Sequence, residues 1–201
     1  MTTNPTKRDL VSTIQERWSP YRFDRRAIEH DKLAKCFEAA SWAASSFNEQ
    51  PWRWILASRE DRPGFEKMLG CLMAPNQGWA AEAGALVLTA YRTKFSRNEN
   101  PNRVALHDLG QASAQFALQA TAMGLQVHQM AGINLSQIRT EYQIADEFEP
   151  ATAIAVGYPE TREPANENEL AMVKREQSAR QRNPISQQVF TDTWGNAVDW
   201  T

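Results

Sequence analysis

Residues 108–124, with the sequence DLGQASAQFALQATAMG, carry the strongest periodic pattern in the chain. Apolar side chains recur at helical spacing along one side, at Leu109, Ala112, Phe116, Ala120 and Met123. Small residues cover much of the rest, so other backbones can approach this helix closely on several sides. Asp108 is placed to cap its N-terminus, and Gly124 to stop its C-terminus. We therefore expect a helix at the centre of the protein.

Helical and strand-like patterns alternate around this central segment. Helices are expected over residues 9–18, 31–44, 62–73 and 135–144, with Asp31 as the N-cap of the second. Short apolar runs over residues 54–58, 85–92, 125–132 and 151–159 are typical of buried strands. This alternation excludes the all-α and all-β classes.

Length and composition indicate one folded domain over residues 1–201, with 42% hydrophobic and 23% charged residues. A net charge of -2 provides no global positive field for nucleic acid or anionic lipid. The chain has no apolar window long enough for a membrane span and no secretory leader pattern, so a cytoplasmic protein is expected. Cys36 and Cys71 lie in helical patterns and are expected as buried free thiols.

Motifs of several enzyme classes are missing. The chain contains no HExxH, GxxxxGK[ST], GxGxxG or GxSxG string, so metalloprotease, P-loop, dinucleotide-fingerprint and nucleophile-elbow readings have no support. His107 and Asp108 are adjacent, but sequence neighbours rarely face each other, and the capping role of Asp108 is favoured over a catalytic dyad.

Arginines gather near both ends of the chain. Arg17, Arg22, Arg25 and Arg26 lie in or near RWSPYRFD, and Arg180 and Arg182 lie in RQRNP. Arginine suits phosphate because its planar fork donates two hydrogen bonds to two oxygens. Either group alone is typical of a solvated surface. Together with Ser19 and a polar loop at residues 45–50, they predict a phosphate site beside a surface that can hold a heteroaromatic ring.

The C-terminal segment, residues 165–201, is charged in its first half and carries four apolar residues in an irregular setting later: Val189, Phe190, Trp194 and Trp200. A frayed surface helix with a floppy end explains the charge, but it leaves the aromatic residues without a packing partner. An extended arm lying across a second subunit would supply one.

Three strings together resemble the FMN-dependent nitroreductase family: RWSPYRFD, AASSFNEQPWRW and RQRNP. The resemblance runs from about Arg17 to Pro184. Its most specific part is N-x-Q-P-W, formed here by Asn48, Gln50, Pro51 and Trp52, whereas R-x-S and R-x-R are weak motifs alone. Ala44 stands where the family usually has proline.

The resemblance implies a set of FMN-binding positions. Those near the phosphate and ribityl chain are Arg17, Trp18, Ser19, Arg180 and Arg182. Those that reach the flavin from the other subunit are Ser45, Ser46 and Asn48, with Gln50 in the same motif. Those near the pyrimidine side of the ring are Asn76 and Trp79, and the backbone turn near flavin N5 is Ala131 and Gly132. Many members have a basic residue where this chain has Trp79.

The resemblance also implies a fold and an activity. The fold is α+β, with a mixed, largely antiparallel sheet flanked by helices, and a C-terminal arm exchanged in a homodimer whose FMN sites lie at the subunit interface. The activity is ping-pong hydride transfer from NADH or NADPH through flavin N5 to nitroaromatic, quinone or related acceptors. No side-chain acid or base is obligatory in such a scheme. Flavin reduction, enone reduction, reductive dehalogenation and a non-catalytic flavin-binding protein remain as alternatives.

Overall fold

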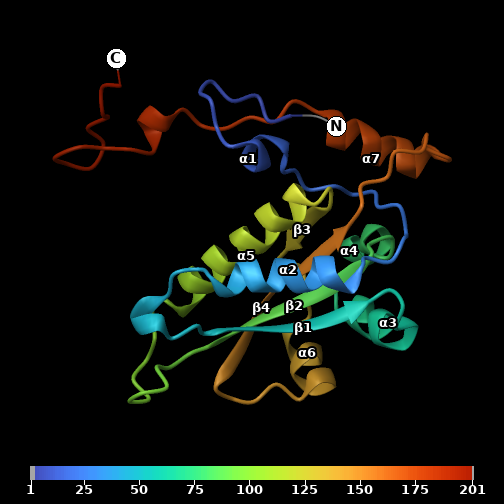
Figure 1. Ribbon diagram of the computed structural model, residues 1–201, viewed down its shortest axis with the longest axis horizontal. Helices are drawn as coiled ribbons and strands as arrows, with labels where there is room; N and C mark the ends of the chain where they lie inside the picture. The colour runs from blue at the N-terminus through green and yellow to red at the C-terminus, as the bar shows by residue number, and fades with distance from the viewer. Residues whose placement is uncertain (1–2, 201) are drawn as a thin grey trace.

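The computed structural model describes residues 3–200, which contain a four-stranded sheet (Figure 1). The strands are β1 (Trp52–Ser58), β2 (Ala85–Arg92), β3 (Gln126–Met130) and β4 (Phe148–Gly157). They lie in the order β1-β2-β4-β3, and each neighbouring pair is antiparallel. The helices are α1 (Ser12–Glu16), α2 (His30–Ser41), α3 (Arg62–Gly70), α4 (Ala74–Ala80), α5 (Ala105–Ala122), α6 (Leu135–Tyr142) and α7 (Glu167–Gln177). The expected α+β class is confirmed.

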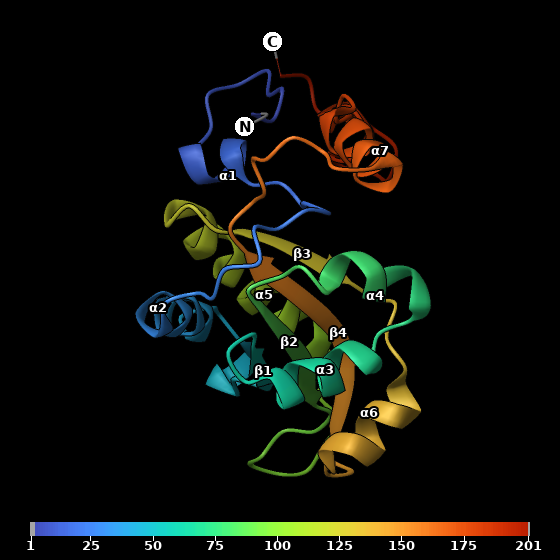
Figure 2. The same cartoon turned by 90° about the vertical axis from the view of Figure 1, so that its right-hand side faces the viewer.

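Alternation along β2 divides the core between the two faces of the sheet. Ala85 and Val87 pack with α2 and α5, whereas Leu86 and Leu88 pack with α3, α4 and α6. The strands lie between these two helical layers in Figure 2. Phe116 of α5 is fully buried, in agreement with a central position for this helix.

The start of α5 differs from the prediction. The helix begins at Ala105, its N-cap is Val104 without a side-chain bond, and Asp108 lies in the first turn. The Asp108 carboxylate is buried and accepts a hydrogen bond from the backbone N–H of Ser46 at 3.0 Å, so the capping role predicted for it is wrong. Gly124 follows the helix with a φ of 76°, which confirms it as the stop.

Other boundaries also differ. α1 has five residues, far fewer than the ten expected. α2 begins at His30 after Glu29, so Asp31 is a first-turn residue and not the N-cap. The helix expected over residues 62–73 ends at Gly70, and an unpredicted helix, α4, follows with proline in its first turn. That proline favours a helix start here, a signal that the prediction of a helix ending at residue 73 does not use.

The chain beyond β4 forms α7 and then an extended segment with one short 3-10 turn, Ile185–Gln187. Asn166 caps α7 by accepting a hydrogen bond from the Glu169 N–H. The extended segment runs past α1 and away from the sheet (Figure 1). Its Trp194 is 93% exposed and Trp200 is 52% exposed, so these rings find little to pack against within one chain. Within residues 3–200, no helix combines the length and apolar character needed to cross a membrane.

Candidate functional site

Three arginines converge where the N-terminal segment meets the chain after α7. Arg17, Arg180 and Arg182, which we call the arginine cluster, lie close enough that burial, followed by repulsion from Arg180 and Arg182, lowers the pKa of Arg17. Arg17 Nη1 donates to Ser19 Oγ at 3.3 Å, and Arg180 Nη1 donates to the Arg17 carbonyl at 3.2 Å. Neither Arg17 nor Arg182 forms a salt bridge with a described residue. Converging cations of this kind are suited to a bound anion.

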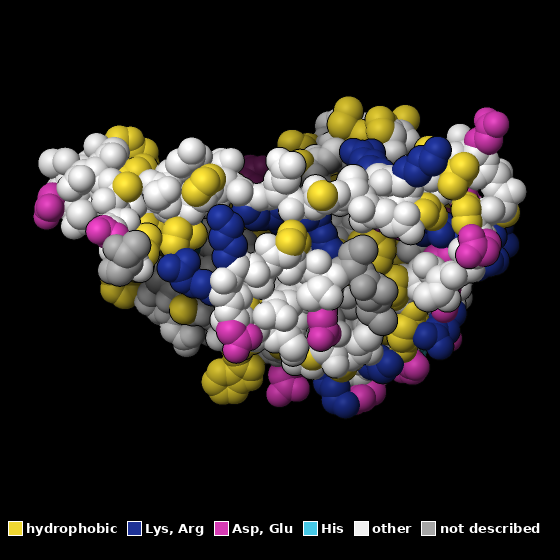
Figure 3. All heavy atoms as spheres, turned by 90° about the horizontal axis from the view of Figure 1, so that it is seen from above, with side chains coloured by type: hydrophobic (Ala, Val, Ile, Leu, Met, Phe, Trp, Pro, Cys, Tyr) yellow, Lys and Arg dark blue, Asp and Glu magenta, His cyan; other side chains and the backbone are white. Residues whose placement is uncertain are grey.

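This face of the molecule is hollowed. Figure 3 views the side that carries α1, α7 and the C-terminal segment, and Lys and Arg side chains gather in a depression near its middle. The N-terminal segment is fixed to the sheet here, because the Trp18 N–H donates to Gln126 Oε1 at 3.1 Å. The Trp18 indole Nε1 is buried without a hydrogen-bond partner among the described residues. A buried indole N–H usually finds a partner, so this donor is available to a bound group.

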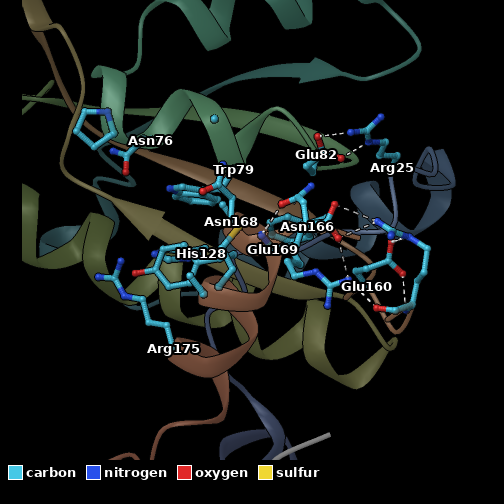
Figure 4. A pocket seen from close by; sticks show the side chains of 18 residues that line it. Arg25, Asn76, Trp79, Glu82, His128, Glu160, Asn166, Asn168, Glu169 and Arg175 are labelled. Atoms are coloured by element: carbon cyan, nitrogen blue, oxygen red, sulfur yellow. Dashed lines mark hydrogen bonds and ion pairs between the residues drawn. The ribbon is translucent and has the colours of Figure 1, made fainter. Parts of the chain in front are cut away.

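A cavity of about 750 Å³ lies between α4, β3, α7 and residues 21–25 and 160–162 (Figure 4), and its wall residue His128 is close enough to Arg17 for that charge to act on it. Tyr21, Trp79 and His128, the aromatic cluster, form part of its wall. The Trp79 and His128 rings stack at 4.3 Å, and Tyr21 meets each of them edge-on. The volume falls in the range of small-molecule and cofactor sites.

His128 is held as a neutral ring. Its Nδ1 lies 2.8 Å from the Pro20 carbonyl, which can only accept, so Nδ1 carries the hydrogen. Burial lowers the pKa of His128, and nearby Arg175 and Arg17 lower it further, against the opposing hydrogen bond to Pro20. Nε2 is therefore an acceptor, and it makes no hydrogen bond to a described residue. A ligand with an N–H or O–H group can use it.

Asn76 joins α4 to the turn after β3. Its side-chain amide donates to the Gly132 carbonyl at 3.1 Å, and a Cβ added at Gly132 would lie 2.5 Å from the same amide nitrogen. A larger residue at 132 would therefore force the Asn76 amide to shift. Ala131, directly before it, is exposed, and Asn76 lines the cavity. The structure places Asn76 and Trp79 in the cavity wall, whereas Ala131 and Gly132 lie behind Asn76 and do not line the cavity.

The polar loop, residues 45–50, lies elsewhere. Phe47, Asn48 and Gln50 have φ values of 54°, 55° and 50°, in the left-handed region that non-glycine residues seldom adopt. Ser45 Oγ accepts from the Gln50 N–H at 3.0 Å, and the bond from Ser46 to Asp108 fixes the loop to the start of α5. A strained loop held this tightly is typical of functional sites.

The polar loop and the arginine cluster occupy opposite ends of α5. Ser46 is bound at Asp108, whereas Trp18 is bound at Gln126, just beyond the end of the helix. From Asp108 to Ala122 the helix rises by about 21 Å at 1.5 Å per residue. Within one chain, the structure therefore does not bring Ser45, Ser46, Asn48 and Gln50 to the cavity.

Residues 14–158 match the model of the Nitroreductase family. This chain belongs to that family. A relative described as an uncharacterized 15.4 kDa protein in the ask 5′ region of Mycolicibacterium smegmatis is 30% identical over 153 residues, which cover 73% of this chain and 99% of that protein.

Solved structures agree with membership in the nitroreductase family. A structure described as an oxidoreductase containing FMN is 26% identical, with a TM-score of 0.87 and coverage of 98% of both chains. A nitroreductase family protein from Clostridium difficile is 23% identical, with a TM-score of 0.70 over 92% of this chain and 99% of that one, and it shows the shared fold. Family membership places the chain among oxidoreductases.

Sequence reasoning missed several residues of this nitroreductase-family cavity. His128 lies three residues before the predicted turn at Ala131, and Tyr21 lies inside RWSPYRFD, so both carried a signal of proximity. Arg175 and Glu176 gave none, because only the docking of α7 against residues 21–22 brings them to the cavity and its rim. No group of three or more His, Cys, Asp or Glu side chains within residues 3–200 is arranged to hold a metal ion.

Proposed function

We propose that this chain is an FMN-dependent NAD(P)H oxidoreductase that reduces nitroaromatic, quinone or related acceptors by a ping-pong mechanism. The observation that carries the proposal is the arginine cluster, which adjoins an aromatic-walled cavity through residues 17–22. An anionic phosphate linked to a flat ring matches this pair of features. When bound, FMN supplies the redox chemistry, taking hydride from the nicotinamide and passing electrons to the second substrate.

The arginine cluster would bind the phosphate of FMN. Arg17, Arg180 and Arg182 would neutralise the phosphate, and Ser19 and the backbone around Trp18 would meet it or the ribityl chain. Burial, followed by repulsion from Arg180 and Arg182, lowers the pKa of Arg17, which supports this assignment because a bound anion would stabilise the buried charge and offset the repulsion. The unpartnered Trp18 indole N–H adds a donor on the same side.

Residues in and next to the cavity wall would hold the flavin ring. Asn76 and Trp79 would face the pyrimidine side, Ala131 and Gly132 would bring backbone close to the flavin N5 position, and His128 Nε2 would accept from a ring N–H. The Gly132–Asn76 contact supports a closely fitted surface here, because a larger residue at 132 would displace the Asn76 amide. These groups bind and orient, and none of them needs to act as an acid or a base.

The polar loop would come from a second copy of the chain. Because Ser45, Ser46, Asn48 and Gln50 sit at the far end of α5, two copies packed with antiparallel α5 helices would place the loop of one beside the cavity of the other. The exposed face of α5 suits such packing, since Gly110 and Ala114 on it are small. Exposed Trp194 and Trp200 on the C-terminal segment would be covered by the same partner. We therefore propose a homodimer with two shared sites.

An absorbance spectrum of the purified protein, recorded before and after adding NADH without oxygen, tests the proposal. The expected result is a set of oxidised-flavin bands that NADH bleaches, with the released cofactor running as FMN. Initial rates with varied NADH and acceptor should then give parallel double-reciprocal lines. A protein that binds FMN but is not bleached by NADH or NADPH would be a flavin-binding protein, and a protein that fails to take up FMN would overturn the proposal.

A further inference from the structure

The charges that line the cavity do not cancel. Four arginines and three glutamates contribute to its wall. Arg25 pairs with Glu82, Arg22 with Glu169 at 3.6 Å, and Arg162 with both Glu160 at 3.4 Å and Glu169 at 3.2 Å. Each glutamate is thus paired with at least one of these three arginines. The fourth arginine, Arg175, is exposed to solvent at the cavity and forms no salt bridge with a described residue, so no carboxylate compensates its charge.

Arg175 is separated from the ion pairs. Figure 4 shows the Arg25–Glu82 pair and the groups around Glu160 and Glu169 gathered toward one end of the cavity, with Arg175 toward the other end, where its charge acts on His128. The Arg175 guanidinium lies 4.4 Å from the centroid of the Tyr21 ring. This stacking orients a planar fork beside the aromatic cluster and leaves its N–H groups to a ligand.

The anchoring of α7 explains why Arg175 stays there. The next residue, Glu176, accepts hydrogen bonds from the backbone N–H groups of Tyr21 at 2.5 Å and Arg22 at 3.0 Å. These two bonds fix the last turn of α7 against the N-terminal segment. The Arg175 side chain is therefore held at the cavity by a neighbour, and it needs no carboxylate to place it.

We propose that the acceptor bound in this cavity is a planar aromatic acid, whose carboxylate pairs with Arg175 while its ring lies beside Tyr21, the member of the aromatic cluster that the flavin does not use. The proposal rests on the function proposed above and specifies the substrate class of the same site. Arg175 supplies one uncompensated cation, so one acidic group is the matching charge. Asn168, which lines the cavity and makes no side-chain hydrogen bond to a described residue in the structure, offers a further polar contact.

A matched pair of acceptors isolates the charge. With 4-nitrobenzoate, one turnover oxidises one NAD(P)H and consumes one proton; the nitro group gains two electrons, becomes nitroso and releases one water. The methyl ester of 4-nitrobenzoate undergoes the same change without the carboxylate. FMN-loaded wild type, Arg175→Gln, Arg175→Lys and Lys174→Gln are compared. Lys174 is the matched control, because it is an exposed neighbour on α7 that does not line the cavity.

The Arg175→Gln change should raise KM for 4-nitrobenzoate about tenfold or more, as expected for loss of a charge-assisted hydrogen bond. In the same variant, KM for the methyl ester should change by less than about twofold. The Arg175→Lys variant should have a KM for 4-nitrobenzoate between those of wild type and Arg175→Gln. The Lys174→Gln variant should have the wild-type KM for both acceptors. Titration of 4-nitrobenzoate into the oxidised holoenzyme, followed by the flavin difference spectrum, should show the same order of affinities without turnover.

Three results would overturn the inference. Equal changes for the acid and its ester would show that Arg175 acts on packing and not on charge. A rise in KM confined to NADH or NADPH would assign Arg175 to the donor's phosphates. A loss of FMN affinity in Arg175→Gln would assign it to the cofactor. If neither acceptor supports NAD(P)H oxidation, the proposed function fails, whereas the binding titration still decides whether Arg175 recognises the carboxylate.

Discussion

Keeping Arg17 charged in the folded protein costs more free energy than keeping an ordinary surface arginine charged. Burial lowers its pKa first, and Arg180 and Arg182 add repulsion. A chain selected for stability alone would place a carboxylate here, as it does beside Arg25 and Arg162. The absence of a salt bridge from Arg17 to any described residue is best explained by an anion that binds in the folded state.

Removing one member of the arginine cluster should separate binding from stability. We expect Arg17→Ala or Arg182→Ala to weaken FMN binding by roughly one to 3 kcal/mol, the scale of a charge-assisted hydrogen bond, while the melting temperature of the apoprotein does not fall. Fluorescence titration of apoprotein with FMN measures the first quantity, and thermal unfolding the second. Arg62→Ala, on the exposed face of α3, is the control. Wild-type FMN affinity in either variant would remove that arginine from the site.

Gly132 tests the ring end of the site. The Gly132→Ala change would press a methyl group against the Asn76 amide nitrogen, so Asn76 must move and lose its bond to the Gly132 carbonyl. We expect FMN affinity to fall by about 0.5–1.5 kcal/mol, the net value of one hydrogen bond. Gly70→Ala, where an added Cβ meets nothing within 4 Å, should leave FMN affinity unchanged. If both variants bind FMN as wild type does, the turn at 131–132 does not contact the cofactor.

Asp108 shows where residue-level prediction fails. Its position before an apolar periodic run fits a helix N-cap, but its carboxylate instead binds Ser46, 62 residues earlier in the chain. A capping rule reads only neighbours in sequence, whereas this bond depends on how the polar loop folds back on α5. Gly124 was predicted correctly, because its left-handed φ is a local requirement.

At the scale of elements, the buried Asp108 carboxylate connects the polar loop to α5. Asp108→Ala should lower the free energy of unfolding by about 1.5–3 kcal/mol, because a hydrogen bond to a charged acceptor is lost and the Ser46 N–H is left unpaired. Asp108→Asn, which keeps an acceptor oxygen, should lose less. Urea unfolding of the two apoproteins measures both values. Equal losses in the two variants would show that the hydrogen bond is not the cause.

Docking of α7 should depend on pH through Glu176. Burial raises the pKa of Glu176 above its ordinary value of 4.5, and this outweighs its bonds to the Tyr21 and Arg22 N–H groups. An acid whose pKa is higher in the folded state favours folding when protonated, and this contribution is lost as pH rises through the folded pKa. Glu176→Gln should therefore gain stability relative to wild type as pH rises above about 4.5. Urea unfolding between pH 4 and 8 measures the difference in free energy of unfolding between this variant and wild type.

The matched control for this pH-dependent difference in stability is Glu167→Gln, at the exposed start of α7. It removes one negative charge from α7 without touching residues 21–22. If the free energy of unfolding of the Glu167→Gln and Glu176→Gln variants changes equally with pH, the effect comes from net charge and not from burial of Glu176.

For the molecule as a whole, the sequence predicted the fold class and the strands more reliably than the site. Residues 85–90 are apolar except for Thr89, so a buried strand there follows from local composition, and it matches the start of β2. The cavity depends on five segments that meet only in three dimensions: residues 21–25, α4 with Glu82, β3, residues 160–162 and α7. Motif matching located part of it at Asn76 and Trp79. It could not locate Arg175, because no local pattern separates a cavity arginine from a surface one.

The separation of the polar loop from the cavity leads to a prediction about assembly. Ala114 lies on the exposed face of α5 between the two ends of the helix. In a two-fold dimer packed through that face, Ala114→Glu would bury two like charges, at a cost on the order of several kcal/mol. We expect a folded monomer by sedimentation and circular dichroism, with FMN affinity lost even though each chain keeps its arginine cluster. The Thr140→Glu variant, with its change on the exposed face of α6, should remain a dimer with bound FMN.

The Ala114→Glu variant distinguishes a shared site from a complete one. A monomer that binds FMN tightly and oxidises NADH would show that residues 17–19, the cavity and the region after α7 suffice. A dimer that survives the change would place the interface on another surface. Loss of FMN on dissociation, with the melting curve of the monomer still cooperative, is the outcome that follows if Ser45, Ser46, Asn48 and Gln50 reach the flavin of the partner. The reason is that each chain then holds the two halves of a site at opposite ends of α5, where they cannot meet.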